Sequence, residues 1–309
     1  MKTKTYLAIA LTLLLLLLAA CGNDSTSSDN LDSKGTLVVG GKNFTEQFIL
    51  AKITSIYLKE NGYEIEEKTN MGSEVLRQAL SNEQVDLYWE YTGTGLINYL
   101  DQEPASSAEE AYQTVKAIDK EENQIEWLDM SNVNNTYTLM IREDHAEQLG
   151  IQSISDLANY VNENPGTLTF ASNAEFATRS DGLSGVEDVY DFQFGSSNVI
   201  RMDSGLTYQA LDEGQVDIAM GFSTDSRIKG FDLLALEDDK EFFPAYNAAV
   251  TVREAIVDEH PELVELLAPL AESLDTETMT TLNYTVDIEQ MNESEVAREW
   301  LLEQGLIEE

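Results

Sequence analysis

The segment TLVVGGKNFTEQFILAKITSIYL, from Thr36 to Leu58, is the first part of this chain of 309 residues whose pattern predicts regular secondary structure of a folded domain. Thr36 to Val39 form a short run rich in β-branched residues, which favours a strand and ends in Gly40-Gly41. From Glu46 to Leu58 the apolar residues recur at helical spacing. The segment therefore predicts a strand, a glycine turn and a helix in succession.

The same alternation continues along the chain. Tyr63 to Lys68 and Val85 to Trp89 are typical of strands, and the helical pattern Ser73 to Leu80 lies between them. A second series begins at the predicted strand Tyr137 to Ile141. Strands that alternate with helices predict an α/β fold with mostly parallel strands. Because a globular part of roughly 275 residues exceeds what one hydrophobic core usually supports, we expect two lobes.

The charge of the chain excludes one class of function. Lys and Arg together number 18 and Asp and Glu number 57, which gives a formal net charge of -39. A surface that binds nucleic acid needs a basic stripe, and this sequence offers none, so we expect no nucleic-acid partner. With 42% hydrophobic residues and only 5 prolines, the chain can still bury a core. We therefore expect an acidic globular protein.

The N-terminal residues have the pattern of a lipoprotein signal peptide. A basic start, Met1 to Tyr6, precedes the apolar run Leu7 to Leu17, and small residues follow up to Cys21. The apolar run is shorter than the ~20 residues of a membrane span, and a signal anchor is the alternative. We expect residues 1–20 to be removed, Cys21 to be lipidated and residues 21–35 to form a flexible tether. This predicts a protein anchored by lipid to the extracellular face of the cell membrane.

Few residues could carry catalytic chemistry. The two histidines, His145 and His260, belong to no HExxH motif, and the chain has no GxSxG motif and no P-loop. Carboxylate clusters are inevitable among 57 acidic residues, and none has the spacing of an EF-hand loop. We therefore expect no catalytic residue, no cofactor and no metal. A cell-surface enzyme that uses a pair of carboxylates is the weaker alternative.

Aromatic residues stand at the ends of predicted strands and in the turns that follow them. In open α/β sheets ligands bind beyond the carboxyl ends of the strands, and in two-lobed proteins this region lies between the lobes. Aromatic rings that converge there would form a box for a cation. Each ring taken singly is better explained by packing, so the interpretation rests on their joint placement. The segments are Tyr88 to Gly95, Asn134 to Tyr137, Met220 to Asp225 and Phe242 to Tyr246.

Five motifs carry a family resemblance: Gly41 to Gln47, Tyr88 to Gly95, Asn135 to Tyr137, Gly205 to Leu211 and Leu236 to Lys240. In this order they resemble the substrate-binding lipoproteins of ABC importers that take up the osmoprotectants glycine betaine, carnitine or choline. The resemblance implies a two-lobed type II periplasmic-binding-protein fold, with the ligand cleft between lobes that two crossover segments connect. We expect residues 36–136 plus 242–309 to form one lobe and residues 137–241 the other.

The resemblance also implies a ligand cage. By position, Tyr91, Tyr137 and Tyr246 match three walls of the family's aromatic cage for a trimethylammonium group. The fourth wall falls on Phe222, where relatives usually have tyrosine. Phenylalanine keeps the π face and loses only the hydroxyl, so we expect the cation–π attraction to persist at this position.

The polar end of the implied ligand faces three further residues. Lys42, Thr94 and Asn135 match the family positions at this end. Lys42 could pair with a ligand carboxylate, and Thr94 is neutral where an acid would repel one. The resemblance thus implies a preference for zwitterions, such as glycine betaine or carnitine, over choline. Tyr208 is a weaker candidate and is expected to be a packing residue.

The function implied is that of a monomeric binding protein that captures a quaternary-ammonium compatible solute and delivers it to an ABC permease. A binding protein of the same fold for another small solute, such as an amino acid, is the alternative, and the tyrosines would then merely stack against it.

Overall fold

Two five-stranded sheets organise residues 33–308, the part of the chain that this computed structural model describes. The predicted signal peptide 1–20, the lipidation site Cys21 and the tether up to residue 32 lie outside the described residues. Lys34–Glu309 form one compact unit. No helix within the described part is both long enough and apolar enough to cross a membrane.

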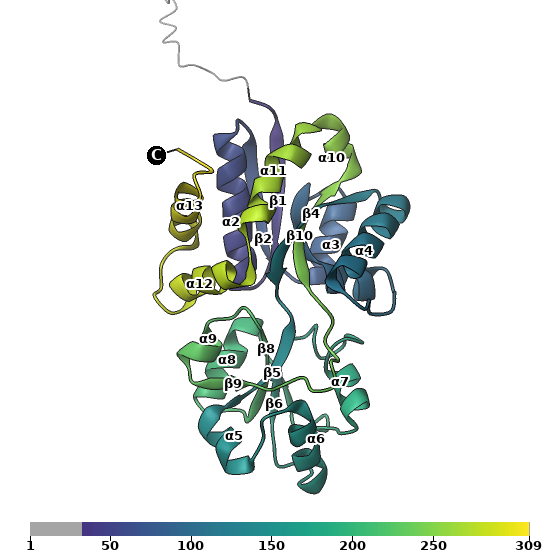
Figure 1. The fold of residues 1–309 in the computed structure, drawn as a ribbon, viewed down its shortest axis with the longest axis vertical. Helices are drawn as coiled ribbons and strands as arrows, with labels where there is room; N and C mark the ends of the chain where they lie inside the picture. The colour runs from purple at the N-terminus through teal and green to yellow at the C-terminus, as the bar shows by residue number, and fades with distance from the viewer. Residues whose placement is uncertain (1–32, 309) are drawn as a thin grey trace, which may run out of the picture. The chain divides into compact units, whose positions relative to one another are not determined.

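The first sheet has the strand order β2-β1-β3-β10-β4. β1 is parallel to β2 and β3, whereas β10 is antiparallel to β3 and β4. We call this sheet, together with the helices that follow its strands, lobe I (Figure 1). Its strands are β1 (Thr36–Lys42), β2 (Glu64–Met71), β3 (Leu87–Tyr91), β4 (Ile125–Asn134) and β10 (Asn247–Arg253). Its helices are α2 (Thr45–Glu60), α3 (Ser73–Ser81), the short π-helix η1 (Thr94–Tyr99), α4 (Ala108–Asn123), α10 (Glu254–Glu259), α11 (Glu262–Ser273), α12 (Thr276–Asp287) and α13 (Glu293–Glu303).

The second sheet has the strand order β7-β6-β8-β5-β9. β6 is parallel to β7 and β8, whereas β5 is antiparallel to β8 and β9. We call this sheet and the helices that follow its strands lobe II. Its strands are β5 (Tyr137–Arg142), β6 (Phe170–Ser172), β7 (Val199–Arg201), β8 (Ile218–Phe222) and β9 (Leu233–Ala235). Its helices are α5 (Glu143–Leu149), α6 (Ile154–Glu163), α7 (Leu183–Tyr190), α8 (Ser204–Asp212) and α9 (Arg227–Gly230).

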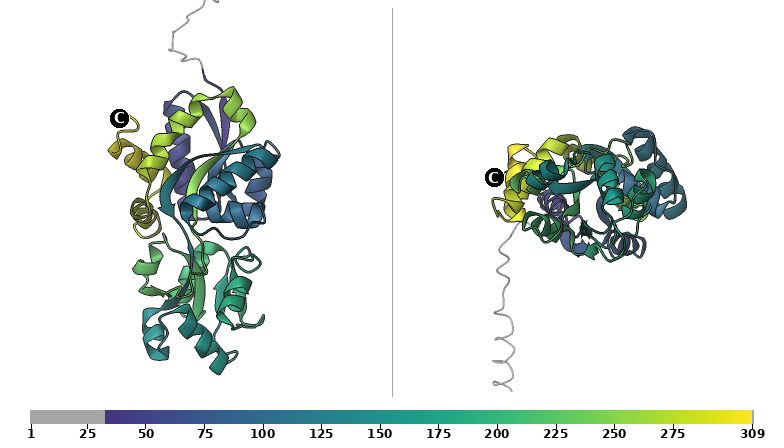
Figure 2. Two further views of the ribbon diagram at one scale, coloured as in Figure 1. Left: turned by 45° about the vertical axis from the view of Figure 1, so that its right-hand side comes forward. Right: turned by 90° about the horizontal axis from the view of Figure 1, so that it is seen from below.

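The prediction of an α/β fold with mostly parallel strands is confirmed, although each sheet contains one strand that runs opposite to the other four, β10 in the first sheet and β5 in the second. The path of the chain explains the difference. β10 joins the first sheet only after the chain has passed through lobe II, and it therefore runs opposite to the neighbouring β3 and β4. The C-terminal helices α12 and α13 then pack against α2 in lobe I (Figure 1 and Figure 2).

Two segments connect the lobes. Asn135 and Thr136 join β4 to β5, and residues 236–246 join β9 to β10. The backbone N–H of Asn135 donates to the carbonyl oxygen of Tyr246 at 3.0 Å, so the two segments lie side by side where they cross (Figure 1). The family resemblance places the lobe boundaries after residues 136 and 241. The first lies at the end of the first segment and the second lies within the second segment, and both boundaries stay a prediction.

A repeated unit occurs once in each lobe. The sequence SEVLRQALSNEQVDLYWEY starts at Ser73, and SGLTYQALDEGQVDIAMGF starts at Ser204, with QAL and QVD at the same spacing in both. Each copy forms a nine-residue helix, α3 or α8, followed by a five-residue buried strand, β3 or β8. The aspartate of QVD accepts a backbone N–H in both copies, from Val38 to Asp86 and from Thr169 to Asp217, each at 2.8 Å. The two lobes therefore present equivalent strand ends to one another.

Candidate ligand-binding site

A cavity lies between the strand ends of the two lobes. All seven residues that the sequence analysis proposed for the site line it, although their contact with a ligand stays a prediction. They are Lys42, Tyr91, Thr94, Asn135, Tyr137, Phe222 and Tyr246. Six further residues line the cavity and were not predicted from the sequence; they are Asn43, Phe44, Ser73, Asn173, Glu175 and Ser204.

The fold explains why residues distant in sequence meet in this cavity. Lys42 is the last residue of β1, Tyr91 of β3 and Phe222 of β8. β1 and β3 are parallel, so their carboxyl ends lie at the same edge of the first sheet, and such edges are where ligands bind in α/β folds. Tyr137 begins β5 directly after the first crossover, and Tyr246 ends the second one.

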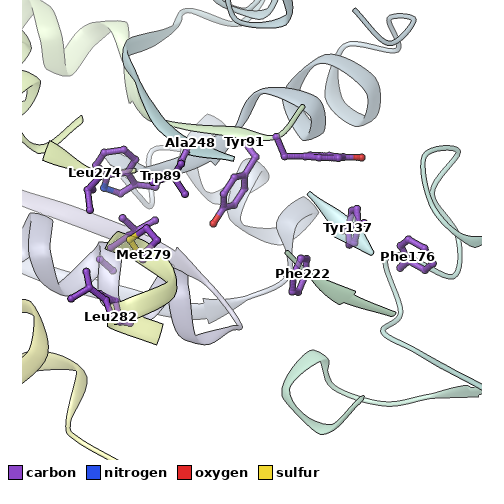
Figure 3. Packing of buried hydrophobic residues seen from close by; sticks show 14 of the residues in the cluster. Trp89, Tyr91, Tyr137, Phe176, Phe222, Ala248, Leu274, Met279 and Leu282 are labelled. Atoms are coloured by element: carbon purple, nitrogen blue, oxygen red, sulfur yellow. The ribbon is translucent and has the colours of Figure 1, made fainter. Parts of the chain in front are cut away.

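The aromatic side chains of the cavity contact one another across the lobes. The Tyr137 ring lies 5.2 Å from that of Phe222 and 5.5 Å from that of Tyr246, the latter edge-on at 85°. Phe44 stacks on Phe222 at 4.9 Å and on Tyr91 at 6.2 Å between ring centroids. Figure 3 shows the rings of Tyr91, Phe222 and Tyr137 in succession. Phe44 thus links the walls contributed by the two lobes.

Hydrogen bonds fix the orientation of two of these rings. The Tyr91 hydroxyl donates to Glu46 Oε1 at 2.6 Å, and the Tyr246 hydroxyl donates to Asp181 Oδ2 at 2.6 Å. Burial, together with the neighbouring carboxylates, raises the pKa of both hydroxyls well above the ordinary 10.0. Both side chains therefore remain neutral phenols with intact π faces.

Lys42 already has an anionic partner. Its Nζ lies 2.5 Å from Glu90 Oε1, and both side chains are buried, with 3% and 0% exposed. Glu90 also accepts hydrogen bonds from the hydroxyls of Tyr88 and Tyr99 at 3.0 Å each. A ligand carboxylate would therefore share Lys42 with Glu90. The sequence could not show this pair, because it forms across neighbouring strands.

A second buried cation, Arg179, adjoins the cavity and was not predicted from the sequence. Arg179 follows β6, and its guanidinium lies 5.3 Å from the centroid of the Tyr137 ring. Nη2 of Arg179 lies 3.3 Å from Oγ1 of Thr94 and 2.6 Å from Oδ2 of Asp181. Burial alone would raise the pKa of Asp181, but the hydrogen bonds and charge of Arg179 outweigh it and leave that pKa below the ordinary 3.8. Arg179 therefore brings a paired positive charge next to Thr94.

Asn135 offers an acceptor that is not in use within the described structure. Its Nδ2 donates to Glu46 Oε1 at 3.0 Å, while its Oδ1 is buried and has no hydrogen-bond partner among residues 33–308. Buried polar atoms are nearly always satisfied, so an unpaired one that lines a cavity suits a ligand or an ordered water. This agrees with the prediction that Asn135 faces a ligand but does not test it.

Two other groups from the sequence analysis lie elsewhere. Tyr208 does not line the cavity; it is fully buried, and its hydroxyl accepts the backbone N–H of Phe222 at 2.8 Å. It therefore supports the strand end that carries Phe222. Neither His145 nor His260 lines the cavity. Residues 33–308 contain no group of three or more His, Cys, Asp or Glu side chains arranged to hold a metal ion.

Comparison with known proteins identifies the family. Residues 35–303 match the family of substrate-binding domains of ABC-type glycine betaine transport systems. The chain belongs to this family. It is therefore a binding protein of an ABC importer, and it functions outside the cytoplasm.

The most informative relatives agree with this assignment. The chain is 43% identical over 279 residues to the glycine-betaine-binding protein of Pseudomonas aeruginosa, covering 89% of each sequence. It is 33% identical over 305 residues to the carnitine transport binding protein OpuCC of Listeria monocytogenes, covering 97% of each. A crystal structure described as a glycine betaine/carnitine/choline ABC transporter is 27% identical, with a TM-score of 0.69 over 88% of this chain and 100% of that one. The predicted two-lobed binding-protein fold is thereby confirmed.

Proposed function

We propose that this protein captures a zwitterionic quaternary-ammonium solute, glycine betaine or carnitine, and hands it to an ABC permease. The observation that carries the proposal is the convergence of four aromatic residues from both lobes on one cavity that also adjoins two buried, paired cations. The four aromatic residues are Tyr91, Tyr137, Phe222 and Tyr246. The two cations are Lys42 and Arg179.

The aromatic rings suit the cationic end of such a ligand. A quaternary ammonium has no N–H to donate, so its recognition depends on ring faces, at roughly 0.5 to 2 kcal/mol per ring when desolvated. Three or four rings together with one paired carboxylate are compatible with micromolar affinity, about -8 kcal/mol.

The cations suit the anionic end. Lys42 and Arg179 are each neutralised by one carboxylate, but a guanidinium has five N–H donors and an ammonium has three. A ligand carboxylate can therefore use donors that Glu90 and Asp181 leave free. Choline has no carboxylate and can offer these donors only a neutral hydroxyl, which accepts weaker hydrogen bonds from them. We therefore expect zwitterions to bind more tightly than choline.

The proposal includes membrane attachment. Cys21 carries the lipid anchor after removal of residues 1–20, and the protein acts as a monomer at the extracellular face of the membrane. The sequence pattern supports this part of the proposal. Expression of the full chain and of Cys21→Ser, followed by detergent partitioning and mass spectrometry of the N-terminus, tests it. An unmodified wild-type N-terminus would reject the anchor.

Isothermal titration calorimetry tests the ligand class. Glycine betaine, carnitine, choline and L-proline are titrated into the wild-type protein, and we expect glycine betaine or carnitine to bind at micromolar Kd and choline more weakly. Binding of proline alone would favour the alternative of a binding protein for an amino acid. Absence of heat with glycine betaine, carnitine and choline would reject the proposal.

A further inference from the structure

Glu46 lies behind the cavity and not in its lining. It occupies the first turn of α2, only 2% of it is exposed, and it directly precedes Gln47, which donates to the Tyr91 hydroxyl at 3.1 Å. No ligand role follows from its position, because the cavity is lined by other residues. Its surroundings nevertheless connect it to both lobes.

Four donors from four different parts of the chain bind its two carboxylate oxygens. Oε1 accepts from the hydroxyl of Tyr91 at 2.6 Å and from Nδ2 of Asn135 at 3.0 Å. Oε2 accepts from Oγ1 of Thr224 at 2.7 Å and from Nδ2 of Asn283 at 3.4 Å. Tyr91 ends β3, Asn135 lies in the first crossover, Thr224 follows β8, and Asn283 belongs to α12. One carboxylate thus joins lobe I, lobe II and the crossover.

This arrangement is costly for folding. Burial raises the pKa of Glu46 above its ordinary 4.5, and the hydrogen bonds from Tyr91, Thr224 and the two asparagines offset only part of that shift. Among the described residues, Glu46 forms no ion pair with a Lys, Arg or His side chain. Burial of a carboxylate without a cation costs free energy and does not stabilise the folded protein. The four hydrogen bonds therefore indicate that Glu46 positions the side chains that donate them.

The donors hold the two facing walls of the cavity. Tyr91 is itself a wall, and its hydroxyl is fixed by Glu46. Thr224 lies two residues after Phe222, and its carbonyl oxygen also accepts from Asn283 at 3.1 Å. The Phe44 ring stacks on both walls. The carboxylate therefore sets the position of the Tyr91 wall in lobe I relative to the Phe222 wall in lobe II.

We propose that Glu46 is a positioning residue that couples assembly of the aromatic cage to closure of the two lobes. Its bond to Thr224 joins the lobes and exists only while they are together, whereas its bond to Tyr91 lies within lobe I. Loss of the carboxylate removes both the hydrogen bond that holds the Tyr91 ring and the contact that favours the closed arrangement. Ligand release becomes faster, and cationic and zwitterionic ligands are affected alike, because both use the rings.

The inference rests on the proposed function, and two variants test it. Glu46→Gln keeps the shape, removes the negative charge and replaces one acceptor oxygen with an NH2 donor group, whereas Thr224→Val removes only the donor from lobe II. A hydrogen bond to a charged group is stronger than one between neutral groups, so we expect Thr224→Val to raise the Kd for glycine betaine roughly tenfold. Glu46→Gln raises it at least as much, mainly through the dissociation rate. Glu60→Gln, at the exposed end of α2, is the matched control and leaves the Kd unchanged.

Titration calorimetry and stopped-flow fluorescence provide the measurements, with thermal unfolding of the ligand-free variants alongside. We expect Thr224→Val to unfold at the wild-type temperature, because its donor stabilises the closed, ligand-bound state. The double variant Glu46→Gln/Thr224→Val should bind no more weakly than Glu46→Gln alone, because both changes remove the same contact. If Glu46→Gln does not fold, Thr224→Val carries the test alone.

The outcomes separate the inference from the function beneath it. If the wild-type protein binds no quaternary-ammonium ligand, the proposed function fails. If the wild-type protein binds glycine betaine but Thr224→Val binds it within twofold of wild type at the same dissociation rate, only the role of Glu46 fails. A loss of affinity for glycine betaine without a loss of affinity for choline would also overturn the proposed role of Glu46. That pattern is expected of residues that contact the ligand carboxylate.

Discussion

Tyr91 and Phe222 occupy equivalent positions in the two lobes. Each is the last residue of a five-residue buried strand that follows a nine-residue helix and the tripeptide QVD. The repeated unit therefore contributes one aromatic wall from each lobe, and the Phe44 ring stacks between them. The proposed cage is built from one local motif used twice, and it is complete only where the two lobes meet.

Phe222 should act through its π face. Phe222→Tyr keeps the π face and adds a hydroxyl, and we expect it to bind glycine betaine within about threefold of wild type. Phe222→Leu keeps apolar volume without a π face, and the loss of one desolvated cation–π contact weakens binding roughly tenfold. Calorimetric Kd values of both variants check this. Equal affinity of the leucine and tyrosine variants would show that position 222 acts by packing alone.

The tyrosine walls should be more sensitive. Tyr137→Ala and Tyr246→Ala each remove a ring face, and Tyr246→Ala also removes the donor to Asp181. We expect both to raise the Kd for glycine betaine and for choline at least tenfold, as measured by titration calorimetry. Tyr284→Ala, a change at an exposed tyrosine of α12, is the control and leaves both values unchanged. Wild-type affinity in both cage variants would remove the cage.

Lys42 and Arg179 should distinguish zwitterions from choline. In Lys42→Ala the buried Glu90 loses its cation, so we expect glycine betaine to bind at least tenfold more weakly while choline binds as well as before or more tightly. The double variant Lys42→Met/Glu90→Gln removes both charges and isolates the contribution of the carboxylate contact. Arg179→Gln should follow the same pattern. An equal loss of affinity for glycine betaine and choline in these variants would show that Lys42 and Arg179 do not bind the ligand carboxylate.

The pair Arg179 and Asp181 should make stability depend on pH. The pKa of Asp181 in the folded protein lies below its ordinary 3.8, so its stabilising contribution is fully present above that value and is lost as the pH falls further. Asp181→Asn leaves a buried guanidinium without its anion, which costs about 3–5 kcal/mol at pH 7. Urea unfolding of both proteins from pH 7 to pH 3 measures the difference.

We expect that difference in unfolding free energy to narrow once the pH passes below 3.8. Asp129→Asn, at an exposed position of β4, should match wild type throughout. If the difference in unfolding free energy between wild type and Asp181→Asn stays constant or widens on acidification, Asp181 does not stabilise the fold as an ionised partner of Arg179.

The sequence predicted those features that depend on local patterns. Alternating strands and helices gave the fold class, and the aromatic residues at strand ends pointed to residues that do line one cavity. The direction of β10 was not predictable from pattern, because it depends on the return of the chain from lobe II. Glu90 as the partner of Lys42 also escaped, since the pair joins strands that are separated in sequence by α2, β2 and α3.

Arg179, Phe44 and Glu46 were missed for a related reason. Arg179 lies in the irregular segment after β6, where no periodicity marks a buried charge. Phe44 directly precedes α2 and resembles any apolar residue at a helix start. Glu46 is one of 57 acidic residues, and only its four donors, brought together by the fold, distinguish it from the others.

Determining a crystal structure of the protein with bound glycine betaine would test the central claim most directly. The account predicts the trimethylammonium group within about 6 Å of the ring centroids of Tyr91, Tyr137, Phe222 and Tyr246. The ligand carboxylate should point to Lys42, Thr94 and Arg179. A ligand bound outside this cavity, or one whose ammonium group faces the cations, would contradict the account.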